Sequence, residues 1–477
     1  MSSNESVASI INDLLEHLTK IVQGTSVLID YKLIDNASLL LKGEASLYQI
    51  SESSVLDKLV FVTLSIIKSD NTTSDAKDVS IQVLDCILSH YEFDQILEKF
   101  SIGLFIQGLE SQKEKLQVLV VGVLSKASPA DIVANTPIMF LLVQILNEPR
   151  SSIALVNVIE KCVFTLAKKG ELIRRRILSD EIISTFRKMK SDSNVAPRLY
   201  DIVLKLLPVI PSMPEDLYLI TTQAITSSDD VLLDSFTISF YTNLLTQIGE
   251  NVGLLPILDR LEEQISYISQ IFCDPMFKPE IGGGDYLDAA LFLCQLSFLS
   301  LKKFGRADSS HHILDHATSN YLTHKNCRCL LSNVNPSVLR SHKHFIKDFK
   351  LDGITVPIYC NMMQDKQLLL EELPITTTDI LKLNVSDFLQ IMSSLIQTEH
   401  GLHKLVKEWP LLMTNLLDIN DVLDSNIWND KLNVIEKLYK NRNQIGVWSS
   451  KIVEVYSLMR NGHAITVEAD VKDTMGP

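Results

Sequence analysis

Glycine and proline are scarce in this chain, with 17 and 15 among 477 residues, below their usual shares of about 7% and 5%. So few turn residues exclude an all-β sandwich or barrel. The longest apolar runs, such as residues 118–123, are shorter than the roughly 20 residues of a membrane helix. The first residues also lack a basic segment followed by an apolar core, so we expect no secretory signal.

These absences predict a soluble, intracellular protein without membrane contact, located in the cytoplasm, with the nucleus as a possible additional location. The chain is acidic, because 44 Lys and Arg face 58 Asp and Glu for a net charge of −14. Hydrophobic residues make up 46%, enough for a sizeable core. Its seven cysteines are an odd number and scattered, which favours reduced thiols over a disulfide framework.

The first half contains a weak internal repeat of paired segments with apolar periodicity. Polar breaks divide the two segments of each pair and lie roughly 36 to 44 positions apart, at Asn71, Ser111, Asn147, Ser191 and Ser227. After such breaks apolar residues recur at i, i+3, i+4 and i+7, the spacing of one helical face. HEAT and armadillo units have a similar length of roughly 40 to 47 residues. The sequence therefore predicts an all-α, HEAT/armadillo-like α-solenoid of stacked helical hairpins, with an irregular helical domain as the alternative.

The expected array has three parts. N-terminal helical repeats cover residues 1–272, C-terminal repeats continue them over 273–460, and a flexible tail covers 461–477. Later helices are expected over 254–271, 286–301, 385–396, 402–417 and 431–439. The polar stretch 304–332 interrupts the apolar pattern and predicts a hinge.

Three short motifs predict helix starts, because a capping side chain precedes a proline that suits the first helical position. They are Ser128-Pro129-Ala130-Asp131, Thr136-Pro137 and Asn335-Pro336.

One candidate metal cluster combines histidines and cysteines: His311, His312, His316, His324, Cys327, Cys329, His342 and His344. Four of them, His324, Cys327, Cys329 and His344, could in principle surround zinc, which prefers four tetrahedral nitrogen and sulfur ligands. Their Cys-x-Cys and His-x-His spacing differs from the C-x2-C to C-x4-C pairs of structural zinc sites. We therefore expect a polar loop with incidental thiols and no metal, with a metal enzyme as the weakest hypothesis.

Other catalytic patterns are missing or incomplete. Gly282 to Gly284 lack the Lys-Ser or Lys-Thr of a phosphate loop, and Asp285 would repel phosphate from the following helix. No G-x-S-x-G or H-E-x-x-H motif occurs. The sequence predicts a non-enzymatic protein with no catalytic residue and no cofactor.

Basic residues cluster only at Lys168, Lys169 and Arg174 to Arg176. Nucleic-acid binding needs many cationic contacts, and the net charge of −14 repels a phosphate backbone. We expect no direct nucleic-acid contact and interpret the cluster as a solvated helix face that pairs with a neighbouring carboxylate. Nuclear import or partner binding remains the alternative.

If the repeats stack, the second helix of each hairpin lines a continuous surface of the kind that solenoids use for binding. The candidate partner-binding residues there are Asp85, Glu160, Tyr200, Asp201, Asp234 and Tyr241. The carboxylates would favour a basic partner, and tyrosines are common interface anchors. At each position, ordinary solvation or core packing is the alternative.

Three stretches resemble the fungal HEAT-repeat chaperones that assemble the base of the proteasome regulatory particle, a family also described as DNA mismatch repair proteins. They are residues 170–177 (GELIRRRI), residues 84–100 with the core YEFDQILE, and Val447-Trp448 through Tyr456 to Gly462. The chain departs most from the family near residues 311–344. The resemblance implies a helical array without catalytic residues, and it identifies no interface residue.

The same resemblance implies a function and partners. The chain would bind the C-terminal domain of a proteasomal base-ring ATPase subunit, together with the associated non-ATPase base subunit, and hold this module until it joins its neighbours. The alternative hypothesis is a helical-repeat adaptor that acts in DNA mismatch repair.

Overall fold

The computed structural model describes residues 3–25, 28–43, 54–220, 230–274, 276–277, 287–418 and 425–461. These residues form helices joined by short connections, and they contain no strand. The predicted all-α class is therefore confirmed. No helix in these ranges combines the length and apolar character needed to cross a membrane. The chain divides into two compact units, Met1–Ile220 and Thr221–Pro477, a boundary earlier than the expected one after residue 272.

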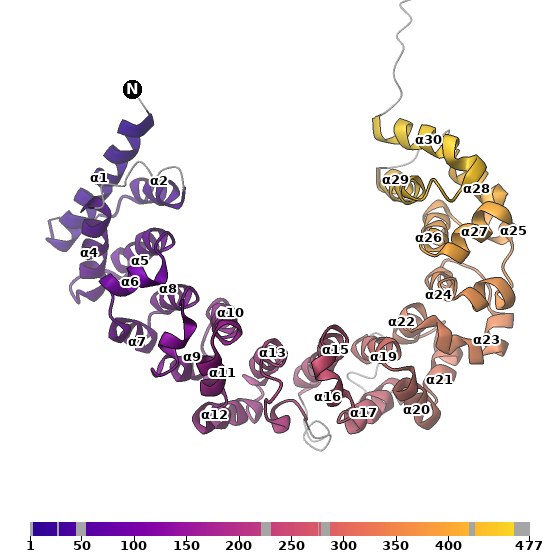
Figure 1. Cartoon of the computed structure of the whole chain (residues 1–477), viewed down its shortest axis with the longest axis horizontal. Coiled ribbons are helices and arrows are strands. Elements are labelled where there is room, and N and C mark those ends of the chain that lie inside the picture. The colour runs from indigo at the N-terminus through magenta and orange to yellow at the C-terminus, as the bar shows by residue number, and fades with distance from the viewer. Residues whose placement is uncertain are drawn as a thin grey trace, which may run out of the picture. The chain divides into compact units, whose positions relative to one another are not determined.

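The first unit is built from hairpins whose helices form two rows. Its helices are α1 (Ser3–Val22), α2 (Tyr31–Lys42), α4 (Ser54–Lys68), α5 (Ser74–Leu88), α6 (Phe93–Lys99), α7 (Ile102–Glu110), α8 (Glu114–Leu124), η1 (Ala130–Val133), α9 (Ile138–Asn147), α10 (Ile153–Lys169), α11 (Glu171–Ile177), α12 (Asp180–Lys190), α13 (Ala196–Leu206) and η2 (Glu215–Leu217). We call α2, α5, α8, α10 and α13 the second-helix row, in which each helix packs against the next (Figure 1). Helices α1, α4, α7, α9 and α12 lie on the opposite side.

The predicted hairpin breaks coincide with real connections. Asn71 lies between α4 and α5, Ser111 between α7 and α8, Asn147 at the end of α9 before α10, and Ser191 between α12 and α13. The repeat segmentation of this unit is therefore confirmed at these four breaks. The fifth break, Ser227, lies outside the described residues.

Cationic side chains join successive hairpins of the first unit at helix C-termini. The Lys126 ammonium group donates hydrogen bonds to the carbonyls of Leu88 at 2.9 Å and Ser89 at 2.6 Å, at the end of α5. The last carbonyls of a helix lack intrahelical donors and carry the negative end of the helix dipole. The ammonium group therefore satisfies these acceptors while connecting two repeats.

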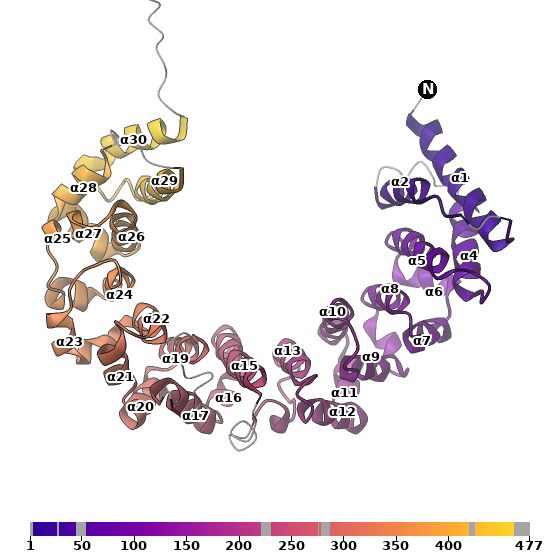
Figure 2. The same cartoon turned by 180° about the vertical axis from the view of Figure 1, so that it is seen from behind.

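The second unit also contains a row of successively packed helices. Its elements are α15 (Val231–Glu250), η3 (Val252–Leu254), α16 (Leu255–Leu258), α17 (Glu262–Cys273), α19 (Asp288–Leu299), α20 (Leu301–His311), α21 (Ile313–Asn320), α22 (Lys325–Asn333), η4 (Pro336–Ser341), α23 (Lys343–Asp348), α24 (Val356–Met362), η5 (Leu368–Glu372), α25 (Thr377–Leu381), α26 (Val385–Ile396), α27 (Glu399–Lys407), α28 (Pro410–Leu416), α29 (Ser425–Lys440), η6 (Gly446–Trp448) and α30 (Ser449–Asn461). Helices α15, α19, α22, α24, α26 and α29 pack each against the next, as Figure 2 shows from behind.

Several sequence expectations for the second unit are confirmed and others are corrected. Helix α26 has the expected bounds, 385–396. The helix expected over 402–417 is divided into α27 and α28, because Pro410 disfavours helical geometry at the residue before it. The hinge expected over 304–332 is wrong, since this stretch forms α20, α21 and α22. Most of its polar residues are exposed or half-buried, whereas Asn326 is buried.

One predicted helix start, Asn335-Pro336, shows the expected capping interaction, because the Asn335 side chain accepts a hydrogen bond from the Ser337 N–H at 3.1 Å at the start of the 3-10 helix η4. At the second, the Thr136 hydroxyl accepts a hydrogen bond from the Ile138 N–H at 3.3 Å, but Pro137 is the residue that precedes α9 and the helix has no side-chain cap. The third motif begins only the short 3-10 helix η1. The triple glycine at 282–284 lies outside the described residues, as does the expected tail beyond Asn461.

Candidate partner-binding surface

The structure exposes only two of the six candidate partner-binding residues. Asp85 on α5 and Asp201 on α13 are exposed. Four others are buried, with exposed fractions of 1% for Glu160, 4% for Tyr200, 2% for Asp234 and 1% for Tyr241. The expectation that these four side chains face a partner is therefore corrected, because neighbouring helices cover them.

Contacts with several neighbouring helices explain this burial. Helix α10, for example, packs against α8, α9 and α13, so its buried side is wider than a single apolar stripe. Helix α15 likewise contacts both α16 and α19. Residues next to the apolar stripe are therefore covered by neighbouring helices.

Glu160 has a structural role in place of the predicted binding role. Its carboxylate accepts a hydrogen bond from the Lys205 ammonium group and so connects α10 to α13. Burial raises the pKa of Glu160, although Lys205 acts in the opposite direction. The ion pair offsets part of the cost of removing this carboxylate from water.

Asp85 lies in a groove of about 270 Å³ between α5 and α8. The lining residues are Asp78, Ile81, Gln82, Asp85, Glu114, Lys115, Val118 and Leu119. Three of them are carboxylates, and Asp78 and Asp85 are seven residues apart, which places them on one face of α5. The i to i+7 spacing could have identified Asp78 from the sequence, whereas Glu114 comes from another helix and could not be found in this way.

The carboxylates of the groove differ in how far they are neutralised. Asp78 forms an ion pair of 2.7 Å with Lys115, and Glu114 accepts a hydrogen bond from the Ser152 hydroxyl at the start of α10. Within the described ranges, the Asp85 carboxylate forms no hydrogen bond or ion pair. Asp78 is therefore the groove carboxylate whose charge is compensated by an ion pair, and Asp85 and Glu114 present negative charge beside the apolar side chains of Ile81 and Val118.

Asp201, on α13, is the second exposed residue among the six candidates. Neighbouring protein atoms remove part of its hydration and raise the pKa of Asp201, while the charge of Lys205 opposes this change. A basic group from a partner would stabilise the ionised carboxylate. Asp85 and Asp201 are thus two exposed acidic positions on the second-helix row.

The arginine cluster of α11 is paired within the protein. The Arg174 side chain donates to the Ala167 carbonyl at 2.9 Å. Arg175 pairs with Glu171 at 2.5 Å, and Arg176 pairs with Glu181 at 2.7 Å. These contacts match the interpretation of the cluster as a helix face that pairs with neighbouring groups.

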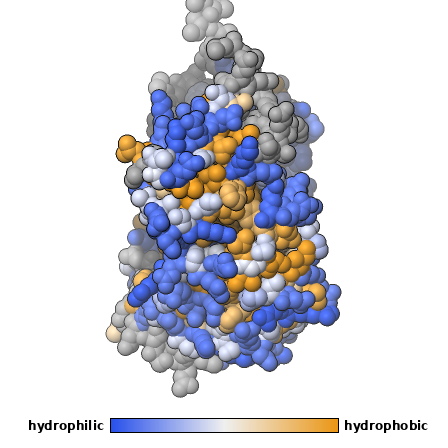
Figure 3. Space-filling model, turned by 90° about the vertical axis from the view of Figure 1, so that its left-hand side faces the viewer, coloured by the Kyte–Doolittle hydropathy of each residue, from blue (hydrophilic) through white to orange (hydrophobic). Residues whose placement is uncertain are grey.

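A hollow of about 420 Å³ lies between α1 and α4, on the other side of the first unit. It is lined by Leu15, Thr19, Asp57, Lys58, Phe61 and Val62, and the Phe61 side chain is 73% exposed. Figure 3 shows an interrupted band of hydrophobic residues among hydrophilic ones on the side that carries α1 and α4. This apolar hollow differs in chemistry from the acidic groove.

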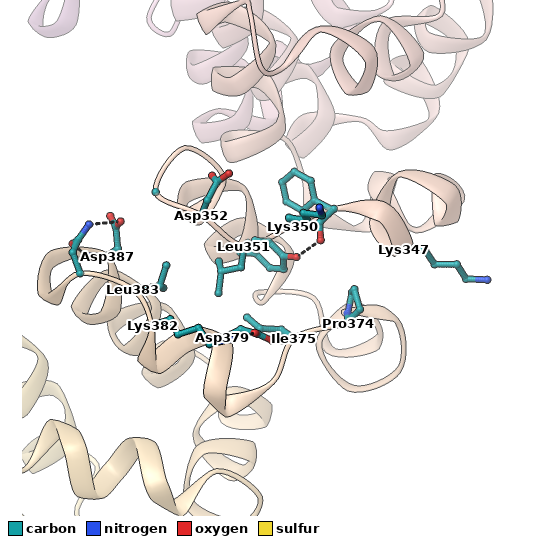
Figure 4. A pocket seen from close by; sticks show the side chains of 14 residues that line it. Lys347, Lys350, Leu351, Asp352, Pro374, Ile375, Asp379, Lys382, Leu383 and Asp387 are labelled. Atoms are coloured by element: carbon teal, nitrogen blue, oxygen red, sulfur yellow. Dashed lines mark hydrogen bonds and ion pairs between the residues drawn. The ribbon is translucent and has the colours of Figure 1, made fainter.

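A larger cavity of about 800 Å³ occurs in the second unit, between α24, α25 and α26. Its charged lining residues are of both signs: Lys347, Lys350, Asp352, Asp379, Lys382 and Asp387. Figure 4 shows that Lys347, Asp352 and Asp387 point in different directions and do not converge on one point. Such divergence is unsuited to acid–base or nucleophilic catalysis, which requires functional groups within hydrogen-bond reach of one reacting atom.

Within the His and Cys stretch, α21 and α22 bring together a different set of possible metal ligands from the four residues considered in the sequence. The ring nitrogens of His316 and His324 and the Cys327 thiol all lie within 4.8 Å of one another. Cys329 is separate and contacts the Asn333 amide at 3.9 Å, and the His344 side chain lies outside the described residues. Burial and the neighbouring His324 lower the pKa of His316, which favours its neutral form.

The fold and these surfaces define a class of protein, a helical-repeat scaffold with an acidic groove on one row of helices. The N-terminal domain of the family described as DNA mismatch repair protein HSM3 matches residues 12–246 of the chain, and the C-terminal domain of the same family matches residues 256–476. The chain therefore belongs to the HSM3 family.

Curated relatives agree with this assignment at low identity. A protein of Candida glabrata named DNA mismatch repair protein HSM3 is 24% identical over 443 residues, or 89% of each chain. Its namesake in Debaryomyces hansenii is 22% identical and covers 94% of each chain. The Saccharomyces cerevisiae protein of that name is 21% identical over 87% of this chain and 88% of its own.

Among solved structures, one from a study of the interaction between cadherin and beta-catenin aligns with 96% of each chain. Its TM-score is 0.31 at 12% identity, a similarity too low to support any argument.

Proposed function

We propose that this protein is a non-enzymatic assembly chaperone that binds the C-terminal domain of a proteasomal base-ring ATPase subunit. The observation that supports the proposal is the acidic groove between α5 and α8, where Asp85 has no compensating charge among the described residues. An uncompensated carboxylate next to apolar side chains suits a folded partner that presents a basic and an apolar group together. The resemblance of residues 84–100 and 170–177 to the base-assembly chaperones indicates the kind of partner.

A stacked-hairpin scaffold suits this activity for a physical reason. The second-helix row places Asp85 on α5 and Asp201 on α13, two helices that are separated in the row by α8 and α10. A folded domain that contacts several repeats can bury roughly 1,200 to 2,000 Å², the size of a specific interface. No covalent step is needed for capture or release.

Capture of purified partner tests the proposal. The full-length protein is expected to retain a recombinant base ATPase subunit, and Asp85→Lys and Asp201→Lys should each weaken retention, more strongly at low salt. Glu98→Lys is the matched control, because Glu98 is an exposed acid on α6, outside the second-helix row. Failure of the folded, monodisperse protein to retain any base ATPase subunit would overturn the proposal.

The names of the relatives support a second candidate, an adaptor in DNA mismatch repair. The pairing of Arg174, Arg175 and Arg176 within the protein favours a protein partner over direct DNA contact. A repair role predicts an increased mutation rate in cells that carry Asp85→Lys but assemble proteasomes normally. An increase that occurs only together with an assembly defect would instead favour the chaperone.

A further inference from the structure

Three helices of the second unit converge where α17 ends, α21 passes and α22 begins. His316 comes from α21, His324 is the residue before α22, and Cys327 is in the first turn of α22. Their ligand atoms lie within 4.8 Å of one another. Tetrahedral zinc with bonds of about 2.0 to 2.3 Å separates its ligand atoms by roughly 3.5 Å, so small side-chain rotations would bring these three atoms to zinc-binding distances.

The histidines are available as ligands. The His316 Nε2 atom is buried and has no hydrogen-bond partner in the described part of the chain. A buried polar atom without a partner costs free energy, and a metal ion at this position would supply the missing interaction. The His316 ring is held by an edge contact with Phe272, with centroids 5.5 Å apart, and it stacks near His324 at 6.4 Å.

From this convergence we propose that His316, His324 and Cys327 bind a zinc ion that ties α21 to α22. Neutral imidazoles and a thiolate are ligands that zinc prefers. Binding releases the proton of the Cys327 thiol to solvent, so the site gains one sulfur–zinc bond for each proton lost.

Cys273 is the candidate for the fourth ligand. It is the last residue of α17, and it follows Phe272, which contacts the His316 ring. Its thiol lies outside the cluster of the three other ligand atoms, so the Cys273 side chain has to turn toward that cluster to bind the ion. Two histidines and two cysteines would give a closed tetrahedral site of the structural kind. Such a site would connect α17 to α21 and α22, which follow it in the chain after α19 and α20.

Metal analysis of the full-length, tag-free protein tests the proposal. After removal of metal, the protein is incubated with zinc and desalted against a weak competing chelator, and bound zinc is measured by mass spectrometry. The wild-type protein is expected to retain one equivalent and to melt at a higher temperature with zinc than without it. Cys327→Ser and His316→Gln should lose both effects. Cys329→Ser is the matched control and should keep both, because Cys329 lies outside the cluster.

Cobalt supplies a readout that does not depend on stability. Cobalt in the wild-type protein should show tetrahedral d–d bands and a thiolate-to-metal charge-transfer band, which Cys327→Ser abolishes or strongly reduces and Cys329→Ser retains. Cys273→Ser should reduce the charge-transfer intensity, and an unchanged intensity would overturn the assignment of Cys273. If the wild-type protein retains no more zinc than folded Cys327→Ser, the proposed site does not exist.

Discussion

Lys205 on α13 pairs with the carboxylate of Glu160 on α10, a side chain that is only 2% exposed. The pair connects two successive helices of the second-helix row, α10 and α13. It also determines how Glu160 titrates, because burial raises the pKa of Glu160 and Lys205 counteracts that increase.

We expect Lys205→Met to destabilise the protein in a pH-dependent way. A buried acid with a raised pKa contributes stability that is complete below its unfolded pKa and is lost as the pH rises through the folded pKa. Removing Lys205 raises the folded pKa further, so the variant should lose about 1 to 3 kcal/mol near pH 7 and less near pH 4.5. Urea unfolding at several pH values measures this difference.

The control for this prediction removes the titrating group. In the background of Glu160→Gln, adding Lys205→Met should change stability with a smaller dependence on pH, because the charge of Lys205 then acts on the titration of Asp201 alone. A loss in Lys205→Met that is equally large at low and neutral pH would contradict the assigned role of Glu160.

Arg198→Lys should destabilise the first unit although it conserves charge. The Arg198 guanidinium donates to four carbonyls at and just beyond the C-terminal end of α9, those of Leu146, Glu148, Pro149 and Ser151, at distances from 2.8 to 3.1 Å. A lysine ammonium group cannot reproduce this planar fork. We expect a loss of about 1 to 2 kcal/mol in chemical denaturation. Arg150→Lys, at an exposed arginine nearby, should be close to neutral, and an equal effect of both changes would argue against the fork.

Hairpins were predictable because helical periodicity and polar breaks depend on local sequence. The breaks at Ser111 and Ser191 and the bounds of α26 required nothing beyond that pattern. Exposure was less predictable, since the burial of Glu160 depends on α8, α9 and α13, which pack around α10. Residue polarity alone does not reveal how many neighbours a helix has.

The His and Cys cluster shows a second limit of sequence reasoning. The spacing of possible metal ligands along the chain grouped Cys327 with Cys329, whereas the fold places Cys327 near His316 on the preceding helix. The polar character of residues 304–332 suggested an interruption, although the stretch forms the helices α20 to α22. Both errors have one cause: tertiary packing decides which residues lie next to each other, and the local sequence does not show it.

Asp131→Ala should weaken the start of α11. The Asp131 side chain accepts hydrogen bonds from the N–H groups of Leu172 at 3.0 Å and Ile173 at 3.3 Å, and it therefore caps a helix 41 residues away in sequence. Its loss should cost about 0.5 to 2 kcal/mol, as for other N-terminal caps. Thermal or urea unfolding would show this cost. Asp131→Asn retains an acceptor oxygen and should recover most of the loss, and failure to do so would indicate that charge matters more than the hydrogen bonds.

Two helical glycines should respond to alanine with opposite signs. At Gly122, in the exposed part of α8, an added Cβ meets nothing within 4 Å. Gly122→Ala should therefore stabilise the protein by about 0.5 to 1 kcal/mol, because alanine loses less backbone entropy in a helix.

At Gly401, in the first turn of α27, an added Cβ would lie 2.3 Å from the Leu395 carbonyl oxygen and 2.8 Å from the Thr398 hydroxyl oxygen. The Thr398 hydroxyl caps this helix by accepting a hydrogen bond from the Gly401 N–H at 3.1 Å. Relieving the contact requires movement of the backbone and disturbs the cap, so Gly401→Ala should cost about 1 to 3 kcal/mol. Denaturation midpoints of the two variants compare the effects directly. A stabilising Gly401→Ala would mean that α26 and α27 approach each other less closely than the structure shows.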